Sequence, residues 1–598
     1  IENSITLVTN KNSLLPLIRL DTLKIATISF GNNNLSFFQK RLKYYAKTDD
    51  FIYFDAIRKY GYDGLIKELM KYNIVIAGVH NTYYSSAKRY GISDETIKFI
   101  DDISGRNNVI LDVFANPYSL AYFKNADKCV AVIVSYNDWE ITNDFSAQLI
   151  FGGIPAQGRL PVTPDIRFTV GSGYNTEKIR LKYTRVPEDA GVDSKWLYKV
   201  DSVMNDAIVA DAFPGGQIVA ARHGIVFYQK SFGYHTYHHN LPVTDLDLYD
   251  LASLTKVLGT TPALMKLYDE NKYELDDSLS KYVKEIENSD KSGYKFYDIL
   301  THRAGFRSWI PFYAETVKTE TARQQYYSRD HNEQYSIQVA ENVFLLSSFK
   351  DSIFEQIRKS DTNPYGRYVY SDLGFYLLPL FIESVTNQSF PDYLNTTFYS
   401  VIGAWTFCFN PLQNFDRSDI VPSENDKIFR RQLLHGYVHD QGAAMLGGIS
   451  GHAGLFASAN DVAKIMQMYL DGGEYGDVEY IKPETIEMFT KYQFDSTINR
   501  RGLAWDKPCP GDTTKGLGSG SSSHLAYGHS GYTGTMVWAD PYYDMIYVFN
   551  SNRVYPDAEN WKIIKMNVRT IIEEIFYQAI LSNDKNLVNP KMLKNEEN

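Results

Sequence analysis

Cysteine, long apolar runs and basic tracks are all scarce in this chain of 598 residues. The three cysteines, Cys129, Cys408 and Cys509, are far apart and odd in number, which indicates neither a disulfide framework nor a cysteine-based zinc site. No segment approaches about 18 consecutive apolar residues, so the sequence predicts no transmembrane helix. A signal-peptide pattern is also missing, and because the chain opens on Ile1 and not on methionine, we expect it to be a piece of a longer protein.

The charge balance is acidic. The chain has 61 lysines and arginines against 71 aspartates and glutamates, which gives a formal net charge of -10. No run of basic residues is long enough to follow a phosphate backbone, so we expect no nucleic-acid partner. The composition of 44% hydrophobic and 22% charged residues is ordinary for a folded protein, and the length predicts two or three domains.

The first third of the chain alternates strands with helices. Apolar runs at 23–30, 74–79, 109–115 and 129–135 are typical of buried strands, and amphipathic stretches between them suit helices. This alternation predicts an α/β domain over residues 1–185, with a mostly parallel sheet covered by helices. No glycine-rich phosphate loop follows its first strand, and no catalytic spacing of serine, histidine and acid recurs in it.

A charged stretch that contains Pro187 and Gly191 marks the end of this domain. We therefore expect a linker at 186–193, a second domain over 194–583 and a polar tail at 584–598. In the second domain, residues 217–222 and 226–231 favour a hairpin, so that two antiparallel strands precede the next motif.

The stretch 249–256 carries the most informative pattern. Ser253 stands three residues before Lys256, and an apolar run that favours a buried helix follows them. Three residues is nearly one helical turn, so the lysine amine can reach the serine hydroxyl and activate it as a nucleophile. The spacing alone decides nothing, because the same pattern occurs at least five more times, at Ser85, Ser278, Ser292, Ser347 and Ser582.

Two further motifs give Ser253 its context. In Tyr370-Ser371-Asp372, a loop tyrosine directed at a serine can relay its proton, although packing is the default role for one of 46 tyrosines. His529-Ser530-Gly531, followed by Tyr532, leads into a predicted strand, and glycine in an edge strand lets a substrate backbone approach closely. Alone, this third motif would indicate only a glycine-bent strand with a buried histidine.

In this order and at these separations, the three motifs resemble the serine β-lactamase and penicillin-binding protein superfamily, whose motif set is S-x-x-K, S-D-N and K-T-G. The chain is more similar to the branch of class C β-lactamases, D-alanyl-D-alanine carboxypeptidases and related esterases, where the second motif is Tyr-x-Asn and the third is often His-x-Gly. Stretches at 275–277, 300–305 and 451–456 also match, and the similarity covers about residues 194–580. It implies an α+β domain with an antiparallel sheet flanked by helices, plus a helical subdomain.

The resemblance also implies roles for the site residues. Lys256 and Tyr370 would accept the proton of Ser253, which would attack a carbonyl and become acylated. The remaining motif residues would bind the substrate and its oxyanion: Asp372, His529, Ser530, Gly531 and Tyr532. The oxyanion itself would rest on the N–H groups of Ser253 and Tyr532.

Asp372 departs from the family pattern, in which asparagine is usual. A carboxylate cannot donate the hydrogen bond of a side-chain amide, which counts against recognition of a β-lactam or peptide carbonyl. We therefore favour hydrolysis of some other acyl group over β-lactamase activity.

The N-terminal domain resembles a second family. The stretches 147–152 and 155–162, together with the opening residues 4–16, look like the C-terminal domain of glycoside hydrolase family 3 proteins. In that family the catalytic aspartate belongs to a preceding barrel, so the resemblance implies an N-acetylglucosaminidase-like barrel in the longer protein. Nothing in residues 1–185 would perform that chemistry by itself.

Two histidine groups raise the question of a metal. One group is His235, His238 and His239, and the other is His435, His439 and His452 around Asp440. The first lacks an acid or cysteine at ligand spacing, and glycines near the second favour loops. His302, beside Arg303, favours a hydrogen-bonding core position. We expect neither a metal nor another cofactor.

The sequence thus predicts a serine hydrolase whose small-molecule or peptide substrate is an amide or ester: a cell-wall peptide, a D-alanyl peptide, a β-lactam or another ester. By resemblance we expect cell-wall fragments as the source and an extracytoplasmic location in bacteria. The competing hypothesis is a catalytically silent module that binds a peptide or glycan in the same cleft. The oligomeric state stays open.

Overall fold

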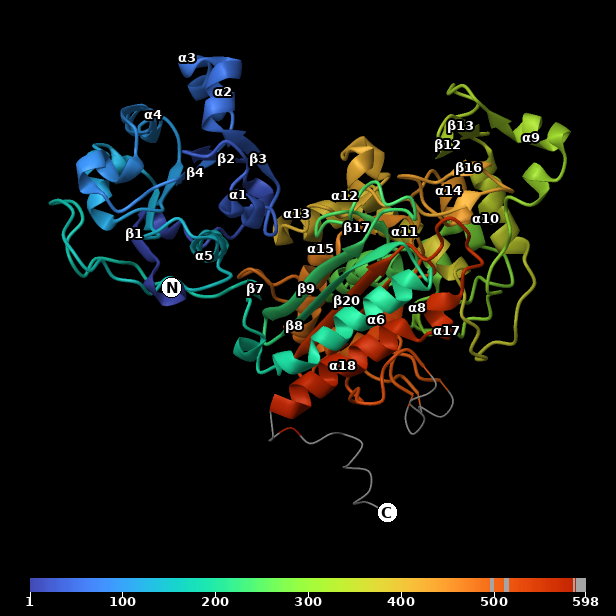
Figure 1. Ribbon diagram of the computed structural model, residues 1–598. Helices are drawn as coiled ribbons and strands as arrows, with labels where there is room; N and C mark the ends of the chain where they lie inside the picture. The colour runs from blue at the N-terminus through green and yellow to red at the C-terminus, as the bar shows by residue number, and fades with distance from the viewer. Residues whose placement is uncertain (495–498, 510–515, 584–586, 588–598) are drawn as a thin grey trace. The chain divides into compact units, whose positions relative to one another are not determined.

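The computed structural model describes residues 1–494, 499–509, 516–583 and 587; the predicted polar tail at 584–598 lies, apart from residue 587, outside the described residues. The chain forms two compact units. Unit 1 comprises residues 1–183 with the short segments 400–405 and 475–478, and unit 2 comprises the rest. Figure 1 shows the long segment of unit 1 in blue to cyan and unit 2 in green to red. The two short segments are a feature that the sequence-based division does not contain.

Unit 1 is built on a six-stranded sheet in the order β1-β6-β5-β4-β2-β3. Five strands are parallel, and β1 (Thr6–Asn10) pairs antiparallel with β6 at one edge. The parallel strands are β2 (Ile25–Phe30), β3 (Thr48–Ile52), β4 (Ile74–Val79), β5 (Val109–Val113) and β6 (Ala131–Val134). All side chains of β2, β4, β5 and β6 are buried, which explains why these strands read as continuous apolar runs.

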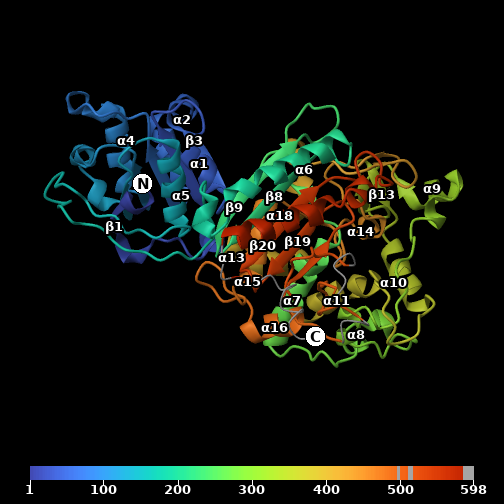
Figure 2. The same ribbon diagram turned by 60° about the horizontal axis from the view of Figure 1, so that its bottom comes forward.

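Helices cover both faces of this sheet (Figure 2). The side chains of Ala26, Ile28 and Phe30 share one core with those of α2 (Tyr53–Tyr60), α3 (Tyr62–Leu69) and α4 (Asp94–Ser104). The opposite face of β2 contacts α1 (Phe37–Leu42), where Gln39 donates a hydrogen bond to Thr27 Oγ1. On that same side α5 (Glu140–Phe151) packs against α1.

The main sheet of unit 2 is antiparallel, and its strands come from two distant parts of the sequence. Strands β8 (Gly215–Arg222) and β9 (Ile225–Gly233) form the expected hairpin. Strands β18 (Tyr527–Ser530), β19 (Met536–Asp540) and β20 (Met545–Ser551) complete the order β18-β19-β20-β8-β9. Strand β18 therefore lies at an edge of the sheet, next to the helical part of the unit.

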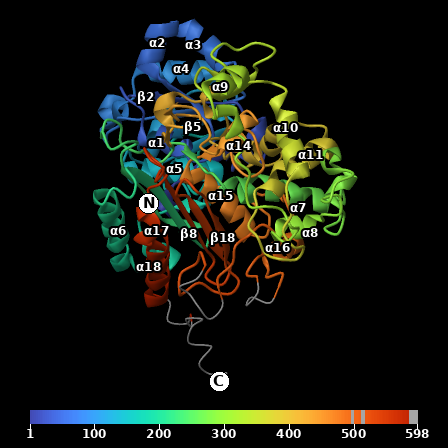
Figure 3. The ribbon, with the colours of Figure 1, turned by 90° about the vertical axis from the view of Figure 1, so that its right-hand side faces the viewer.

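Figure 3 shows this sheet between two groups of helices. On one face, α6 (Tyr198–Val209) and α18 (Val568–Asn583) share a core with the sheet through Met204, Ile572 and Phe576. On the other face, α15 (Ala459–Leu470) contacts β8, β19 and β20. Beyond it lie α7 (Thr261–Asp269) and α11 (Leu373–Thr386), both almost fully buried along their apolar length. The segment between β9 and β18 thus brings the first two motifs to the β18 edge.

The other elements are short, apart from α10. The helices are α8 (Phe296–Leu300), α9 (Glu320–Tyr326), α10 (Phe349–Lys359), α12 (Phe390–Leu394), α13 (Ser400–Ile402), α14 (Gln441–Met445), α16 (Pro483–Thr490) and α17 (Lys562–Lys565). The strands are β7 (Lys182–Tyr183), β10 (Tyr249–Asp250), β11 (Tyr327–Ser328), β12 (Ile337–Ala340), β13 (Val343–Leu345), β14 (Cys408–Phe409), β15 (Asn425–Asp426), β16 (Gln432–Leu433) and β17 (Leu455–Ala457).

Candidate active site

Ser253 lies in a tight turn between β10 and the helix that contains Lys256. Its neighbour Ala252 adopts a positive φ of 47°, a conformation that costs a residue with a Cβ atom about 1–2 kcal/mol. The carboxylate of Asp250 holds this turn, because it accepts hydrogen bonds from the N–H groups of Ala252 at 2.9 Å and His439 at 2.6 Å. Backbone strain held by its surroundings is common where a functional side chain must be aimed.

The helix after Ser253 opens on a π-helical turn over Lys256–Thr260 before it continues as α7. The sequence pattern predicts an ordinary helix here, and a π-helical turn is frequent at functional sites. Lys256 still reaches Ser253: its Nζ donates to Ser253 Oγ at 2.9 Å and to the carbonyl of His452 at 3.2 Å.

Lys256 is fully buried and forms an ion pair with Asp372, with 2.7 Å between Nζ and Oδ1. Burial lowers the pKa of Lys256, but the carboxylate of Asp372 and the nearby Tyr370 raise it by more, so the pKa lies above its ordinary value of 10.5. The lysine is therefore an ammonium at neutral pH. Asp372 is the ion-pair partner of Lys256. The sequence comparison, which concerned only the loss of an amide donor at this position, did not predict this role.

Tyr370 approaches Ser253 from the loop before α11. Its hydroxyl donates to Ser253 Oγ at 3.2 Å, so two donors converge on the same oxygen. The ring of His302 lies 4.5 Å from the Tyr370 ring between centroids. Burial and the positive charge of Arg501 lower the pKa of His302 well below its ordinary value, so this histidine is a neutral support for the tyrosine.

The third motif lies at the end of β18. The His529 ring is 6.1 Å from the Tyr370 ring, and its Nδ1 donates to the carbonyl of Ser530 at 2.9 Å. Burial, together with the positive charges of Arg501 and Lys256, lowers the pKa of His529 to about 3. The histidine is therefore neutral, and its buried Nε2 has no hydrogen-bond partner among the described residues.

Gly531 lies against the turn that carries Ser253. A Cβ atom on Gly531 would stand 2.6 Å from the carbonyl oxygen of Leu251 and 2.1 Å from Thr535 Oγ1, so only glycine fits. The next residue, Tyr532, is 44% exposed, and its ring stacks on that of His439. In the described part of the chain, the N–H groups of Ser253 and Tyr532 have no protein acceptor, as an oxyanion site requires.

Arg501 is a site residue that the motifs did not predict. Its Nε and Nη2 donate to the hydroxyl of Tyr368 at 3.2 and 3.0 Å, and its guanidinium carbon lies 5.4 Å from the centre of the Tyr370 ring. The arginine comes from an irregular segment before β18, where neither periodicity nor a known spacing marks a functional side chain. No sequence signal marks it, because its charge comes to lie beside Tyr370 only in the folded chain.

Three of the histidines considered as metal ligands are paired with separate acidic side chains. His235 pairs with Asp247 at 2.7 Å, His439 with Glu424 at 3.1 Å and His452 with Asp440 at 2.9 Å. Within residues 1–494, 499–509, 516–583 and 587, no three His, Cys, Asp or Glu side chains are grouped to hold a metal ion. The described chain also contains no helix that could span a membrane.

His452 is also hydrogen-bonded to Ser450 at 2.8 Å, which completes a Ser-His-Asp arrangement with Asp440. Ser450 and His452 are 1% and 2% exposed, so a substrate cannot reach them. The arrangement instead fixes the loop whose His452 carbonyl accepts from Lys256.

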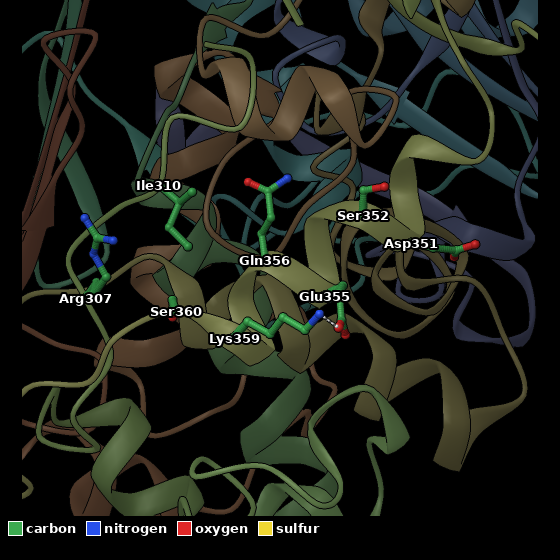
Figure 4. A pocket seen from close by; sticks show the side chains of 8 residues that line it. All are labelled: Arg307, Ile310, Asp351, Ser352, Glu355, Gln356, Lys359 and Ser360. Carbon is green, nitrogen blue, oxygen red and sulfur yellow. Dashed lines mark ion pairs between the residues drawn. The ribbon is translucent and has the colours of Figure 1, made fainter. Parts of the chain in front are cut away.

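A cavity of about 660 Å³ lies beside the second motif and is lined mainly by one face of α10 (Figure 4). Arg307 lines it, and the carbonyl of Arg307 accepts from Ser371 Oγ at 2.5 Å. None of the motif side chains lines this cavity, and its Lys359 is already paired with Glu355 at 2.8 Å. This cavity lies next to the candidate active site and is not part of it.

Comparison with known proteins identifies the family. The Beta-lactamase family model matches residues 200–565. The chain is 31% identical over 408 residues to a "Putative D-alanyl-D-alanine carboxypeptidase" of Salmonella agona, a match that covers 64% of this chain and 88% of the relative. A protein of the same description from Salmonella typhimurium matches at the same identity and coverage.

Similar solved structures include "EstCE1, a hydrolase with promiscuous acyltransferase activity", at 18% identity and a TM-score of 0.47, over 64% of this chain and 99% of that one. Another is "Beta-Lactamase/D-Alanine Carboxypeptidase from Pseudomonas syringae", at 14% identity and a TM-score of 0.45, over 63% and 99%. The family match confirms the expected β-lactamase-like mixture of helices and sheets. The chain belongs to the β-lactamase and penicillin-binding protein family of serine hydrolases.

Proposed function

We propose that this protein is a serine acyl hydrolase that forms an acyl-enzyme on Ser253. The observation that carries the proposal is the convergence of Lys256 Nζ and Tyr370 OH on Ser253 Oγ, at 2.9 and 3.2 Å. A nucleophile held within hydrogen-bond reach of a proton-accepting pair is the arrangement that covalent acyl transfer requires. No other Ser-x-x-Lys match has such a tyrosine among the described residues.

The number of protons on Lys256 and Tyr370 determines which form of the site can react. In the structure Lys256 is an ammonium and Tyr370 is a hydroxyl donor, so neither can accept the Ser253 proton. The reactive form is the one in which this pair has lost one proton. Because the two groups interact, the proton loss belongs to the pair, and activity rises with pH as the pair releases it.

In that form the acyl transfer balances. The pair takes the Ser253 proton while Oγ forms a bond to the substrate carbonyl carbon, and the N–H groups of Ser253 and Tyr532 bind the resulting oxyanion. The bond to the leaving group then breaks, and the leaving group takes the proton from the pair. In the second half, water attacks the carbonyl carbon of the ester on Ser253 and gives a proton to the pair. The bond from that carbon to Oγ then breaks while the pair passes this proton to Oγ, which releases the acid and restores the Ser253 hydroxyl.

The substrate class follows from the charges. Asp372 is held as the partner of Lys256, so it offers no amide donor to a β-lactam or peptide carbonyl. We propose an amide or ester of a cell-wall fragment, with an ester favoured because this donor is missing. A D-alanyl peptide is the second candidate, since the curated relatives are described as "Putative D-alanyl-D-alanine carboxypeptidase". Such a substrate places the protein outside the bacterial cytoplasm.

We also propose that unit 1 is a C-terminal domain of the glycoside hydrolase family 3 type. In support, the opening residues 4–16 lie against both of the other stretches that carry this resemblance, 147–152 and 155–162. A Cβ atom on Gly158 would stand 2.4 Å from the carbonyl oxygen of Ile5, and one on Gly152 would stand 2.9 Å from Pro16 Cβ. The corresponding proposal for the longer protein is an N-acetylglucosaminidase-like barrel. Hydrolysis of a chromogenic N-acetylglucosaminide by the longer protein would test it.

The hydrolase proposal is tested by turnover of chromogenic esters, a D-alanyl-D-alanine peptide and a chromogenic cephalosporin. We expect hydrolysis of at least one ester or peptide, and its loss in Ser253→Ala. Ser278→Ala is the matched control, because Ser278 has the same spacing to Lys281 but no capping hydrogen bond. Equal activity of Ser253→Ala and the wild type would reject the proposal in favour of another nucleophile. No turnover by the wild type would favour the silent binding module.

A further inference from the structure

We propose that Arg501 is a positioning residue of the reaction, which supplies the positive charge that stabilises Tyr370 in its deprotonated form. This inference rests on the proposed function, because it concerns the group that takes the Ser253 proton. It assigns a role to a residue outside the three motifs.

The site lacks the cation that the motif pattern of its superfamily provides. The third motif is K-T-G in many members, so a lysine stands there. Here the position holds His529, whose Nδ1 donates to the Ser530 carbonyl and whose ring is neutral because its pKa is about 3. The other cation, Lys256, is paired with Asp372 at 2.7 Å. A phenolate on Tyr370 would therefore face little uncompensated positive charge from these two positions.

Arg501, from a different part of the chain, supplies a positive charge near Tyr370. Its guanidinium carbon lies 5.4 Å from the centre of the Tyr370 ring, close to the 5.2 Å that separates Lys256 Nζ from the same centre. The side chain is buried, with 5% of the residue exposed, so solvent screens its charge little. A buried cation at this distance favours the charged form of a phenol.

The arginine is held in place by its other contacts. Nε and Nη2 both donate to the Tyr368 hydroxyl, while Nη1 is buried without a hydrogen-bond partner among the described residues. The segment is attached to the third motif through Asp506, whose backbone pairs with that of Arg501 on one side and that of Gly528 on the other. Arg501 is thus fixed to the same strand that carries His529.

Other charged or titratable groups of the described residues also lie near Tyr370. Lys256 comes from the turn before α7, His302 from the loop after α8, Asp372 from the start of α11 and His529 from β18. Asp506 lies 3.8 Å from Arg501 and also accepts from Arg500 at 2.8 and 3.1 Å. Because one Asp506 carboxylate is shared between two arginines, part of the positive charge of Arg501 stays uncompensated.

The pair Arg500 and Arg501 offers a matched experiment. Both arginines neighbour Asp506, but only Arg501 contacts Tyr368 and faces Tyr370. The rate at which a fluorophosphonate labels Ser253, and kcat/KM for a chromogenic ester, are measured against pH in the full chain for Arg501→Met, Arg501→Lys and Arg500→Gln.

For Arg501→Met we expect kcat/KM and the labelling rate to fall roughly 10- to 100-fold, at the lower end of what a general base contributes. The acid limb of the pH profile should move to higher pH, because the deprotonated form has lost a stabilising cation. Arg501→Lys should restore most of the rate. Arg500→Gln should move the limb less than Arg501→Met does, because it leaves the guanidinium beside Tyr370 and only frees Asp506 from its second arginine. A purely structural role would lower the amount of active protein without moving the limb.

An unchanged limb in Arg501→Met would overturn the inference, as would an equal shift in Arg500→Gln. Should Arg501→Met fail to fold, Tyr368→Phe replaces it, since this change removes only the hydroxyl that anchors the guanidinium; a wild-type limb in that variant also overturns the inference. Failure of the proposed function looks different, because the wild-type protein would then carry no label on Ser253.

Discussion

The ammonium of Lys256 lies 2.9 Å from Ser253 Oγ and 2.7 Å from the Asp372 carboxylate, so one cation contacts both the candidate nucleophile and an anion. The carboxylate favours the charged form of the lysine. This ion pair explains why Lys256 is an ammonium in the free protein, and it makes Asp372 the first position to change.

Asp372→Asn should move the acid limb of the kcat/KM profile to lower pH. Asp372 raises the pKa of Lys256. Removing the carboxylate therefore lowers that pKa, and the pair releases its proton at lower pH, by roughly one unit or more for a close opposite charge. The asparagine also restores an amide donor, so labelling by a fluorescent penicillin should increase relative to the wild type. A limb that moves upward, or no change in either measurement, would show that Asp372 does not control Lys256.

Gly531→Ala should reduce activity more than stability. The added Cβ atom would collide with the Leu251 carbonyl at 2.6 Å, which belongs to the turn that aims Ser253. We expect a loss of about 10²–10³ in kcat, the effect of losing one oxyanion donor. Gly293→Ala is the control, because a Cβ atom there meets nothing within 4 Å. If Gly531→Ala retained the activity of Gly293→Ala, the close approach of β18 to the turn would have no catalytic role.

Glu573→Gln should stabilise unit 2 by an amount that grows as pH rises from about 4.5 to about 8. Burial raises the pKa of Glu573 from 4.5 to about 8, although Ser519 and Ser522 donate hydrogen bonds to it. The folded state therefore binds a proton that the unfolded state has released, and the stability from this group, fully present below pH 4.5, is lost as pH rises toward about 8. Glutamine does not ionise, so the Tm of the variant should exceed that of the wild type by at least about 2 °C above that pH. Equal gains at acidic and alkaline pH would contradict this account.

The sequence predicted the parts of the site that depend on local spacing. Ser253 and Lys256 meet because three residues is close to one turn of α-helix. The hairpin of β8 and β9 follows from two short strand-like runs on either side of the His223-Gly224 turn. The charge relationships could not be predicted. Asp372 reaches Lys256, and Arg501 reaches Tyr370, only after segments far apart in sequence have packed together. The neutral state of His529 depends on burial and on Arg501, neither of which its motif contains.

Mass spectrometry of the protein after fluorophosphonate treatment tests the central claim most directly. We predict one adduct, on the peptide that contains Ser253, with labelling that slows in Tyr370→Phe by about 10²–10⁴, the usual contribution of a general base. An adduct on any other serine, or a protein that stays unlabelled at the pH where the Lys256–Tyr370 pair has lost a proton, would contradict the account.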